Sequence, residues 1–85
     1  MSNKVEATFH PGTQPTTVEA GRITNDDLGR IVTARDQSGT VVTGELDYYT
    51  QSRTQTVLRL LYHRVPVEVR TEPDRKITIA GRQAA

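Results

Sequence analysis

The residues best suited to binding chemistry lie near the middle of the chain, where Tyr48 and Tyr49 precede Arg53. Aromatic rings beside a guanidinium group can stack on nucleobases, and small barrels bind single strands with such loops. Arg59, a few residues further on, could extend this surface. An alternative arrangement places one tyrosine at the end of a barrel and the other at the surface or at a subunit contact. We prefer the second arrangement and keep these four residues as candidate ligand or nucleic-acid contacts.

Sequence patterns typical of catalysis or metal binding are absent. The two histidines, His10 and His63, have no further ligand at the spacing of a metal motif. The sequence contains no cysteine, no glycine-rich phosphate loop and no nucleophile elbow. The acidic pair Asp26-Asp27 is better explained by the first turn of a helix, where negative charge is favoured. We therefore expect no catalytic residue, no metal and no cofactor, and we predict that the protein is not an enzyme.

Length and charge limit the classes of protein to which the chain can belong. Its 85 residues suit one domain, near the lower end for independent folding around a single core. The formal net charge is +1, from 11 Lys and Arg against 10 Asp and Glu, which is far from the basic footprint of a dedicated nucleic-acid binder. Only 34% of the residues are hydrophobic and no disulfide is possible, so self-association would be a common remedy for the small core.

The distribution of polar and apolar residues divides the chain into three parts. Residues 1–22 are mostly polar and predict a flexible N-terminal arm, residues 23–80 a small β-barrel domain, and residues 81–85 a frayed tail. The barrel domain begins with a short helical turn capped by Thr24 or Asn25 and ended by Gly29.

Apolar residues recur at every second position after Gly29, which is the period of a half-buried β-strand. This alternation predicts five strands, one from Gly29 to a turn at residues 37–39 and then residues 40–47, 56–62, 65–71 and 76–80, with a loop or distorted hairpin over 48–55. Gly39 supplies the positive φ of a hairpin turn, and Gly44 within a strand indicates a bulge, a bend or a close backbone approach. The fold class predicted is all-β, a small five-stranded, strongly bent open barrel.

One predicted strand, residues 56–62, is apolar on both sides, so its outer face should pack against another part of the protein or against another subunit. In the next strand Pro66 cannot donate to a ladder, which indicates an edge or a strand start. The apolar residues of these two strands form the candidate subunit interface, namely Val57, Leu61, Val65, Val67 and Val69.

Three glycines at fixed spacing carry a resemblance to a known family: Gly29, Gly39 and Gly44. With Leu28, Arg30, Val32, Leu46 and Tyr49 they resemble, over residues 24–49, the first motif of the Sm-like family, which builds ring-shaped RNA-binding oligomers from a helix and five bent strands. That family holds a nucleobase with an acidic residue and an Asn, where this chain has Thr50 and Thr54. Glu72–Lys76 likewise replaces the Arg-Gly-like or Lys-His-like turn of the second motif. The resemblance therefore implies a fold but does not transfer the RNA-binding residues.

The expected function is a non-enzymatic binding or assembly module, a homo-oligomer whose last two strands pair across subunits by β-augmentation. A first alternative is a single-stranded RNA- or DNA-binding Sm-like protein, which the net charge does not support. A second alternative is a phage accessory or inhibitor protein that docks on a host or virion protein. The run from Asp27 to Leu46 is similar in style to small proteins of actinobacterial phages.

The sequence also gives an expectation about location. No stretch approaches the about 20 apolar residues of a membrane helix, and the N-terminus lacks the apolar centre of a signal peptide. We expect a cytoplasmic protein, in the cytoplasm of the host if a phage encodes it, with no membrane partner.

Overall fold

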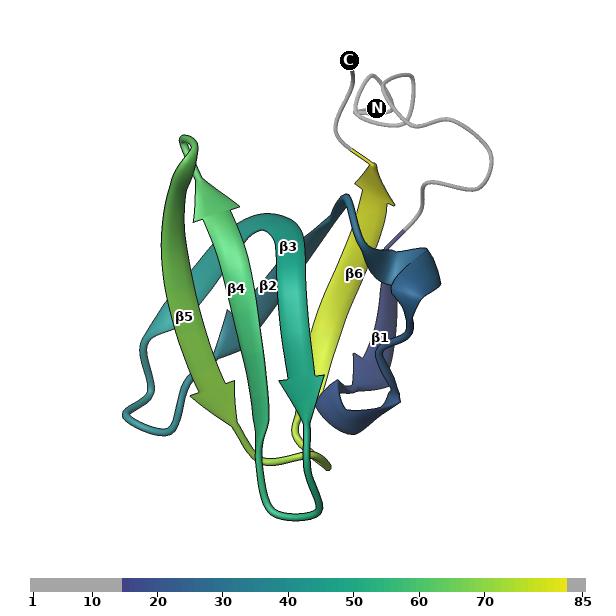
Figure 1. Ribbon diagram of the computed structural model, residues 1–85, viewed down its shortest axis with the longest axis vertical. Coiled ribbons are helices and arrows are strands. Elements are labelled where there is room, and N and C mark those ends of the chain that lie inside the picture. Colours follow the sequence, from purple (N-terminus) through teal and green to yellow (C-terminus); the bar gives the residue numbers. More distant parts are fainter. Residues whose placement is uncertain (1–14, 83–85) are drawn as a thin grey trace, which may run out of the picture.

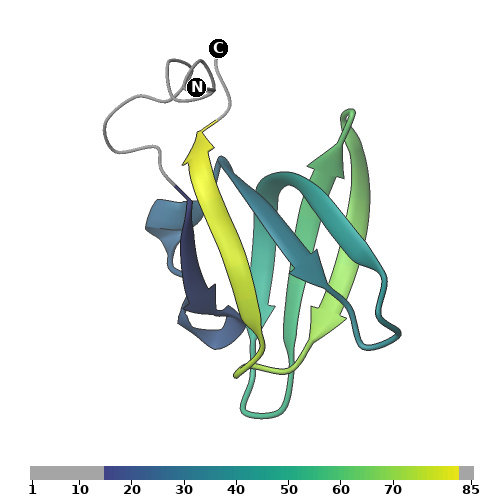
Figure 2. The same ribbon diagram turned by 180° about the vertical axis from the view of Figure 1, so that it is seen from behind.

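The protein forms one antiparallel β-sheet, drawn in Figure 1 and from behind in Figure 2. The computed structural model describes residues 15–82. The sheet has six strands in the order β1-β6-β2-β3-β4-β5, so β1 and β5 form its two edges. The strands are β1 (Thr16–Glu19), β2 (Arg30–Arg35), β3 (Val41–Gln51), β4 (Thr56–Tyr62), β5 (Val65–Thr71) and β6 (Lys76–Arg82). The all-β prediction is confirmed, and the sheet is open.

The hydrophobic core lies inside the curve of this sheet. Alternate residues on each strand face it, because successive side chains of a strand point to opposite faces. Two strands contribute fully buried residues in pairs, Leu58 with Leu60 on β4 and Ile77 with Ile79 on β6. The core is completed by Ala20, Ile23, Val32, Ala34, Leu46 and Val69.

The strand that the sequence did not predict is β1, and the sheet therefore has six strands where five were expected. It pairs with β6, with Val18 opposite Ile77. Only Val18 of this strand packs against the core, so the sequence has no alternation that would predict a strand here. Of the predicted arm, residues 1–14 lie outside the described residues. The predicted tail begins inside β6, which runs on to Arg82.

A first 3-10 turn, η2 (Ala20–Arg22), follows β1. A second 3-10 turn, η3 (Asn25–Asp27), stands where the sequence predicts a helical turn. Thr24 caps it: its side chain accepts a hydrogen bond from the Asp26 amide, and its own amide donates to Asp27 Oδ2 at 3.0 Å. This reciprocal capping satisfies main-chain donors at the start of the turn. Gly29 follows with a φ of 87°, and its amide donates to the Leu46 carbonyl at 2.8 Å. The acidic pair therefore has the structural role that the sequence indicated.

Gly44 lies where β3 and β4 approach most closely. A Cβ atom at this position would lie 2.6 Å from the carbonyl oxygen of Leu61 and 2.9 Å from its carbonyl carbon. Both atoms belong to the backbone of β4, which cannot move aside as a flexible side chain would. The glycine is required by this close approach, one of the three roles predicted for it. Gly39, by contrast, has a φ of 95° in the turn between β2 and β3.

Strand β3 is longer than predicted because residues 48–51 continue it. Its first half pairs with β2, up to Glu45, and its second half pairs with β4, down to Gln51. The register shifts between Leu46 and Tyr48, where Asp47 is an extra residue without a counterpart on β4. Such a β-bulge bends a strand and moves the following side chains to the opposite faces. Of the two predictions for residues 48–55, a loop or a distorted hairpin, the hairpin is confirmed: a bulged strand and a short turn lead into β4.

The turn between β2 and β3 reaches the far edge of the sheet. The amide of Gln37 donates to the carbonyl oxygen of Arg70 on β5 at 3.1 Å. In Figure 1 this turn lies beside β5, at the lower left. One main-chain hydrogen bond therefore joins two parts of the sheet that are separated by β3 and β4 in the strand order.

Candidate functional site

The bulge at Asp47 separates the two tyrosines that the sequence places side by side. Tyr49 lies opposite Leu58 and packs against the core, and its hydroxyl donates to Asn25 Oδ1 at 2.8 Å. Tyr48 lies opposite Arg59 on the outer face of the sheet and is 50% exposed. One tyrosine is therefore part of the fold and the other belongs to the surface.

Arg59 and Tyr48 meet on this outer face together with Asp47. The guanidinium of Arg59 makes contacts of 2.9 Å from both Nε and Nη2 to Asp47 Oδ2. Its central carbon lies 5.0 Å from the centre of the Tyr48 ring, within the range of a cation–π contact. The sequence alone does not indicate Asp47 as part of this surface, because its position beside Arg59 depends on how β3 pairs with β4.

Arg53 does not join this group. It is exposed in the Ser52–Gln55 turn, where the Ser52 amide donates to the Gln55 carbonyl at 2.8 Å. Tyr48 is three strand residues before the end of β3, a separation of roughly 10 Å along the strand. Of the four candidate contacts, the structure brings together Tyr48 and Arg59, and leaves Tyr49 and Arg53 elsewhere.

A shallow depression lies between the 3-10 turn and the bulge. It is lined by Asn25, Leu28, Asp47, Tyr48 and Tyr49, and its volume is about 240 Å³. Pockets that enclose drug-sized ligands measure about 300–1,000 Å³. The depression is therefore below the size at which it would enclose such a ligand.

The five candidate interface residues differ widely in exposure. Val69 is 0% exposed in the core, so its side chain has no surface to offer to another subunit. Along the same face of β5, Val67 is half-buried and Val65 is 58% exposed. Val57 and Leu61 are half-buried on the outer face of β4. The valines of β5 thus leave the core progressively toward the start of the strand.

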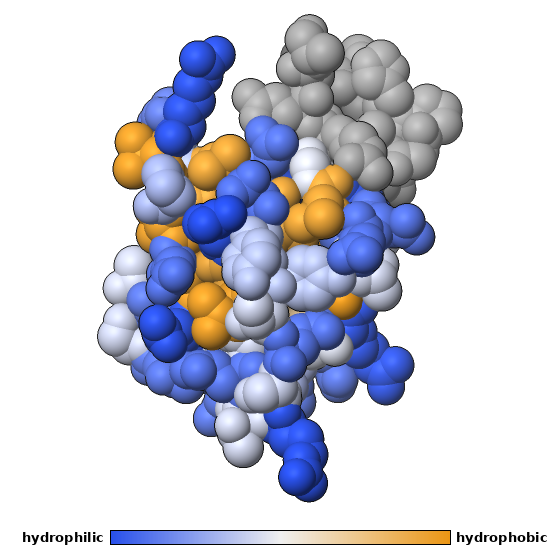
Figure 3. Space-filling model, in the orientation of Figure 1, coloured by the Kyte–Doolittle hydropathy of each residue, from blue (hydrophilic) through white to orange (hydrophobic). Residues whose placement is uncertain are grey.

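The β4–β5 turn presents this exposed end of β5. His63 and Arg64 have φ values of 51° and 69°, which is the left-handed pair of a two-residue type I′ turn. Tyr62 and Val65 flank the turn and are both more than half exposed. Figure 3 shows apolar residues, in orange, gathered over the upper part of this hairpin.

Within the part of the chain that the structure describes, only one of the two strands expected to pair between subunits has a free edge. Strand β6 has β1 on one side and β2 on the other, whereas β5 has only β4 as a neighbour. In a two-residue hairpin the residues next to the turn exchange hydrogen bonds, and bonded pairs then alternate along the ladder. Since Val65 pairs with Tyr62, the main-chain groups of Pro66, Glu68 and Arg70 face the free edge.

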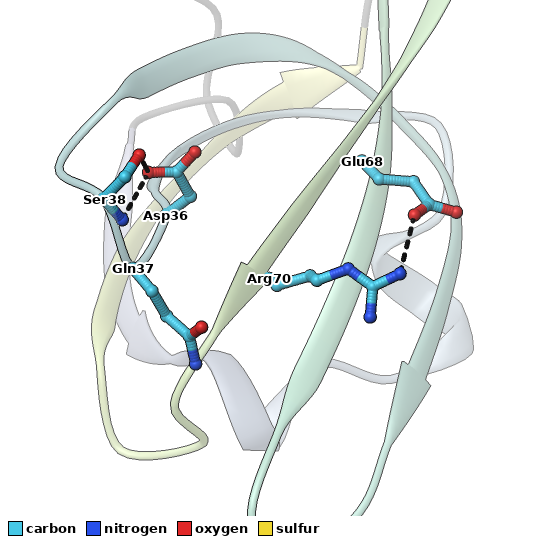
Figure 4. A pocket seen from close by; sticks show the side chains of 5 residues that line it. All are labelled: Asp36, Gln37, Ser38, Glu68 and Arg70. Carbon is cyan, nitrogen blue, oxygen red and sulfur yellow. Dashed lines mark hydrogen bonds and ion pairs between the residues drawn. The ribbon is translucent and has the colours of Figure 1, made fainter.

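A second depression of about 240 Å³ lies between β5 and the β2–β3 turn, as Figure 4 shows. It is lined by Asp36, Gln37, Ser38, Glu68 and Arg70. Asp36 accepts hydrogen bonds from the Ser38 hydroxyl at 2.7 Å and from the Thr40 amide at 2.9 Å, which lower the pKa of its carboxyl group. Glu68 and Arg70 form an ion pair at 3.3 Å.

Residues 15–82 contain neither a candidate metal-binding group nor a helix that could span a membrane. This part of the chain contains no group of three or more His, Asp or Glu side chains placed to hold a metal ion. None of its helices has the length and apolar character needed to cross a membrane.

No family model, curated protein or solved structure matches the chain. The geometry of the sheet and of its free edge is therefore what indicates a function.

Proposed function

We propose that the chain is a non-enzymatic assembly module that associates with a second copy of itself along the uncovered part of the β5 edge. The observation that carries this proposal is the gradient of burial on β5, from 0% exposure at Val69 to 58% at Val65. These valines alternate on the face of the strand that points to the core, yet the core does not extend to Val65. A second copy placed beside β5 would cover them.

The arrangement of the free edge supports the same proposal. β5 is seven residues long, and on its outer side the main-chain groups of Glu68 face no strand formed by residues 15–82. An extended segment can add to such an edge through main-chain hydrogen bonds, while pockets for side chains give selectivity. Only the first half of the edge is open, because the β2–β3 turn covers Arg70. We therefore expect a small interface and association at micromolar concentration.

We also propose that the chain shares the fold of the Sm-like family. Each of the three glycines in the resemblance has a backbone role: positive φ at Gly29 and Gly39, and close approach to β4 at Gly44. Ring closure through the last two strands has no support, since β1 covers the edge of β6.

A nucleic-acid surface has less support. Arg59, the arginine nearest to Tyr48, already contacts both the Asp47 carboxylate and the face of the Tyr48 ring. A nucleobase would have to displace the guanidinium from that ring in order to stack on it.

Sedimentation velocity of the full chain over a range of micromolar concentrations tests the proposal. We expect a concentration-dependent shift from monomer to a larger species. Both copies of the pair carry the change, so Val65→Lys should weaken association about a hundredfold, since each buried valine side chain contributes about 1.5 kcal/mol. Thr17→Lys is the control, because Thr17 is exposed on β1, at the opposite edge of the sheet. A chain that stays monomeric, or equal weakening by both variants, would contradict the proposal.

A further inference from the structure

We infer that the second copy joins as a two-fold symmetric dimer, in which the two β5 strands run antiparallel and Val67 faces the partner's Val67 across the axis. This inference rests on the proposed function and adds to it the symmetry and the strand register. The main-chain groups, the side chains and the charges along the free edge of β5 support this symmetry and this register.

The number of possible registers is small. The main-chain groups that face the free edge belong to Pro66, Glu68 and Arg70, and a symmetric antiparallel pair must place these against the same groups of the partner. The two-fold axis can then pass only through residue 66, 67, 68, 69 or 70. Each register gives a different set of facing residues.

Three local features exclude four of these registers. An axis at Pro66 would place two prolines opposite one another, with no amide to donate. An axis at residue 69 or 70 would place a partner strand where the Gln37 amide already meets the Arg70 carbonyl at 3.1 Å. An axis at Glu68 would bring two glutamates directly opposite, which destabilises a strand pair.

In the remaining register the axis passes through residue 67, and the main-chain hydrogen bonds form along the open half of the β5 edge. The Glu68 amide donates to the carbonyl of the partner's Pro66, and symmetry supplies the second bond. Pro66 accepts but cannot donate, so each of the two Pro66–Glu68 pairs makes one hydrogen bond, and the Glu68 carbonyl stays open to solvent. Val65 lies opposite the partner's Val69, so the most exposed valine of β5 meets the end of the partner's core.

Charge supports the same register. The partner's Arg64, in the turn before β5, comes level with Arg70 and with the depression shown in Figure 4. That depression carries two carboxylates, Asp36 and Glu68, and one guanidinium that is already ion-paired with Glu68 at 3.3 Å. Its net negative charge suits the incoming guanidinium of the partner's Arg64.

Single cysteine variants of the full chain can read the register, because the natural sequence has no cysteine. Facing residues of a non-hydrogen-bonded antiparallel pair have Cα atoms about 4.5 Å apart, within the range of a disulfide. We expect Val67→Cys to form a covalent dimer when oxidised glutathione converts two thiols to one disulfide and is itself reduced to two glutathione thiols. Its yield should exceed that of the control Thr17→Cys at least about tenfold, since paired thiols have millimolar effective concentrations.

The neighbouring positions provide the outcomes that decide between registers. Glu68→Cys and Pro66→Cys place the two thiols on diagonal positions about 7–8 Å apart, too far to bridge, so both should stay near the control yield. Strongest cross-linking at residue 66 or 68, or equal yields at all positions including the control residue 17, would overturn the register. If sedimentation shows a dimer but Val67→Cys does not cross-link, only this inference fails. If the chain is monomeric, the proposed function fails with it.

Discussion

Two buried threonines place unpaired hydroxyl groups in the core. Thr56 and Thr71 face one another across β4 and β5, both are 0% exposed, and neither Oγ1 atom has a hydrogen-bond partner within the described residues. A buried hydroxyl without a partner destabilises the folded state, because it loses its hydrogen bonds to water on folding.

Replacing these threonines with valine should therefore stabilise the protein. Thr56→Val or Thr71→Val keeps the shape of the side chain and removes the hydroxyl, and we expect about 1–2 kcal/mol more free energy of unfolding for each. Urea denaturation measures this change. Thr33→Val is the control, because its hydroxyl lies 2.8 Å from that of Thr43 near the surface and should give no gain. Destabilisation by both core variants would contradict the prediction.

Asp36 should make stability depend on pH. The Ser38 hydroxyl and the Thr40 amide lower its pKa in the folded state. A carboxyl group with a depressed folded pKa contributes stability above its unfolded pKa of about 4, and this contribution disappears as pH falls through the folded pKa. Asp36→Asn keeps an acceptor oxygen but removes the charge. We expect the difference in urea midpoint between the two proteins to be largest at neutral pH and to vanish in acid; a difference that is constant with pH would argue against this origin.

At the scale of the strands, the close approach of β3 and β4 depends on one missing side chain. Gly44→Ala would place a methyl group 2.6 Å from the Leu61 carbonyl oxygen, and we expect a loss of about 2–3 kcal/mol. Gly39→Ala is the comparison, since its Cβ would meet nothing within 4 Å and only the positive φ of 95° is unfavourable, by about 1 kcal/mol. Denaturant midpoints rank the two variants. Gly39→Ala as the more damaging change would contradict the assigned role of Gly44.

The strands also show which features a single sequence can predict. Alternation and the three glycines predicted β2, β4 and β5 well, because buried side chains alternate along those strands with less buried ones. The bulge at Asp47 could not be predicted, since a bulge adds a residue without changing the residue types around it. Consequently the sequence could not separate Tyr48 from Tyr49 or bring Asp47 to Arg59.

The edge of the sheet was harder still to predict. Only Val18 of β1 contacts the core, so pairing with β6 rather than hydrophobic alternation defines that strand. The burial of Val69 beside the exposure of Val65 depends on where the core ends, which strand periodicity does not specify.

For the whole molecule, assembly and stability should be linked. A partner that binds only the folded chain raises the apparent melting temperature with concentration. We expect the midpoint of thermal unfolding to rise when protein concentration rises from about 1 to 100 µM, because a micromolar dimer becomes populated over that range. Differential scanning calorimetry at several concentrations measures it. Val65→Lys should reduce the dependence, and a native chain whose midpoint is constant would count against self-association.

The single hydrogen bond between Gln37 and Arg70 joins the two ends of a long path through the sheet, from β2 through β3 and β4 to β5. The Gln37 side chain is exposed, so its amide hydrogen can exchange with solvent deuterium once this bond breaks, without unfolding of any strand. The exchange rate of the Gln37 amide therefore reports how often the β2–β3 turn separates from β5. If a second copy binds at the edge of β5, the Gln37 amide should exchange more slowly at high protein concentration. The exchange rates of amides in the Ser52–Gln55 turn should not change.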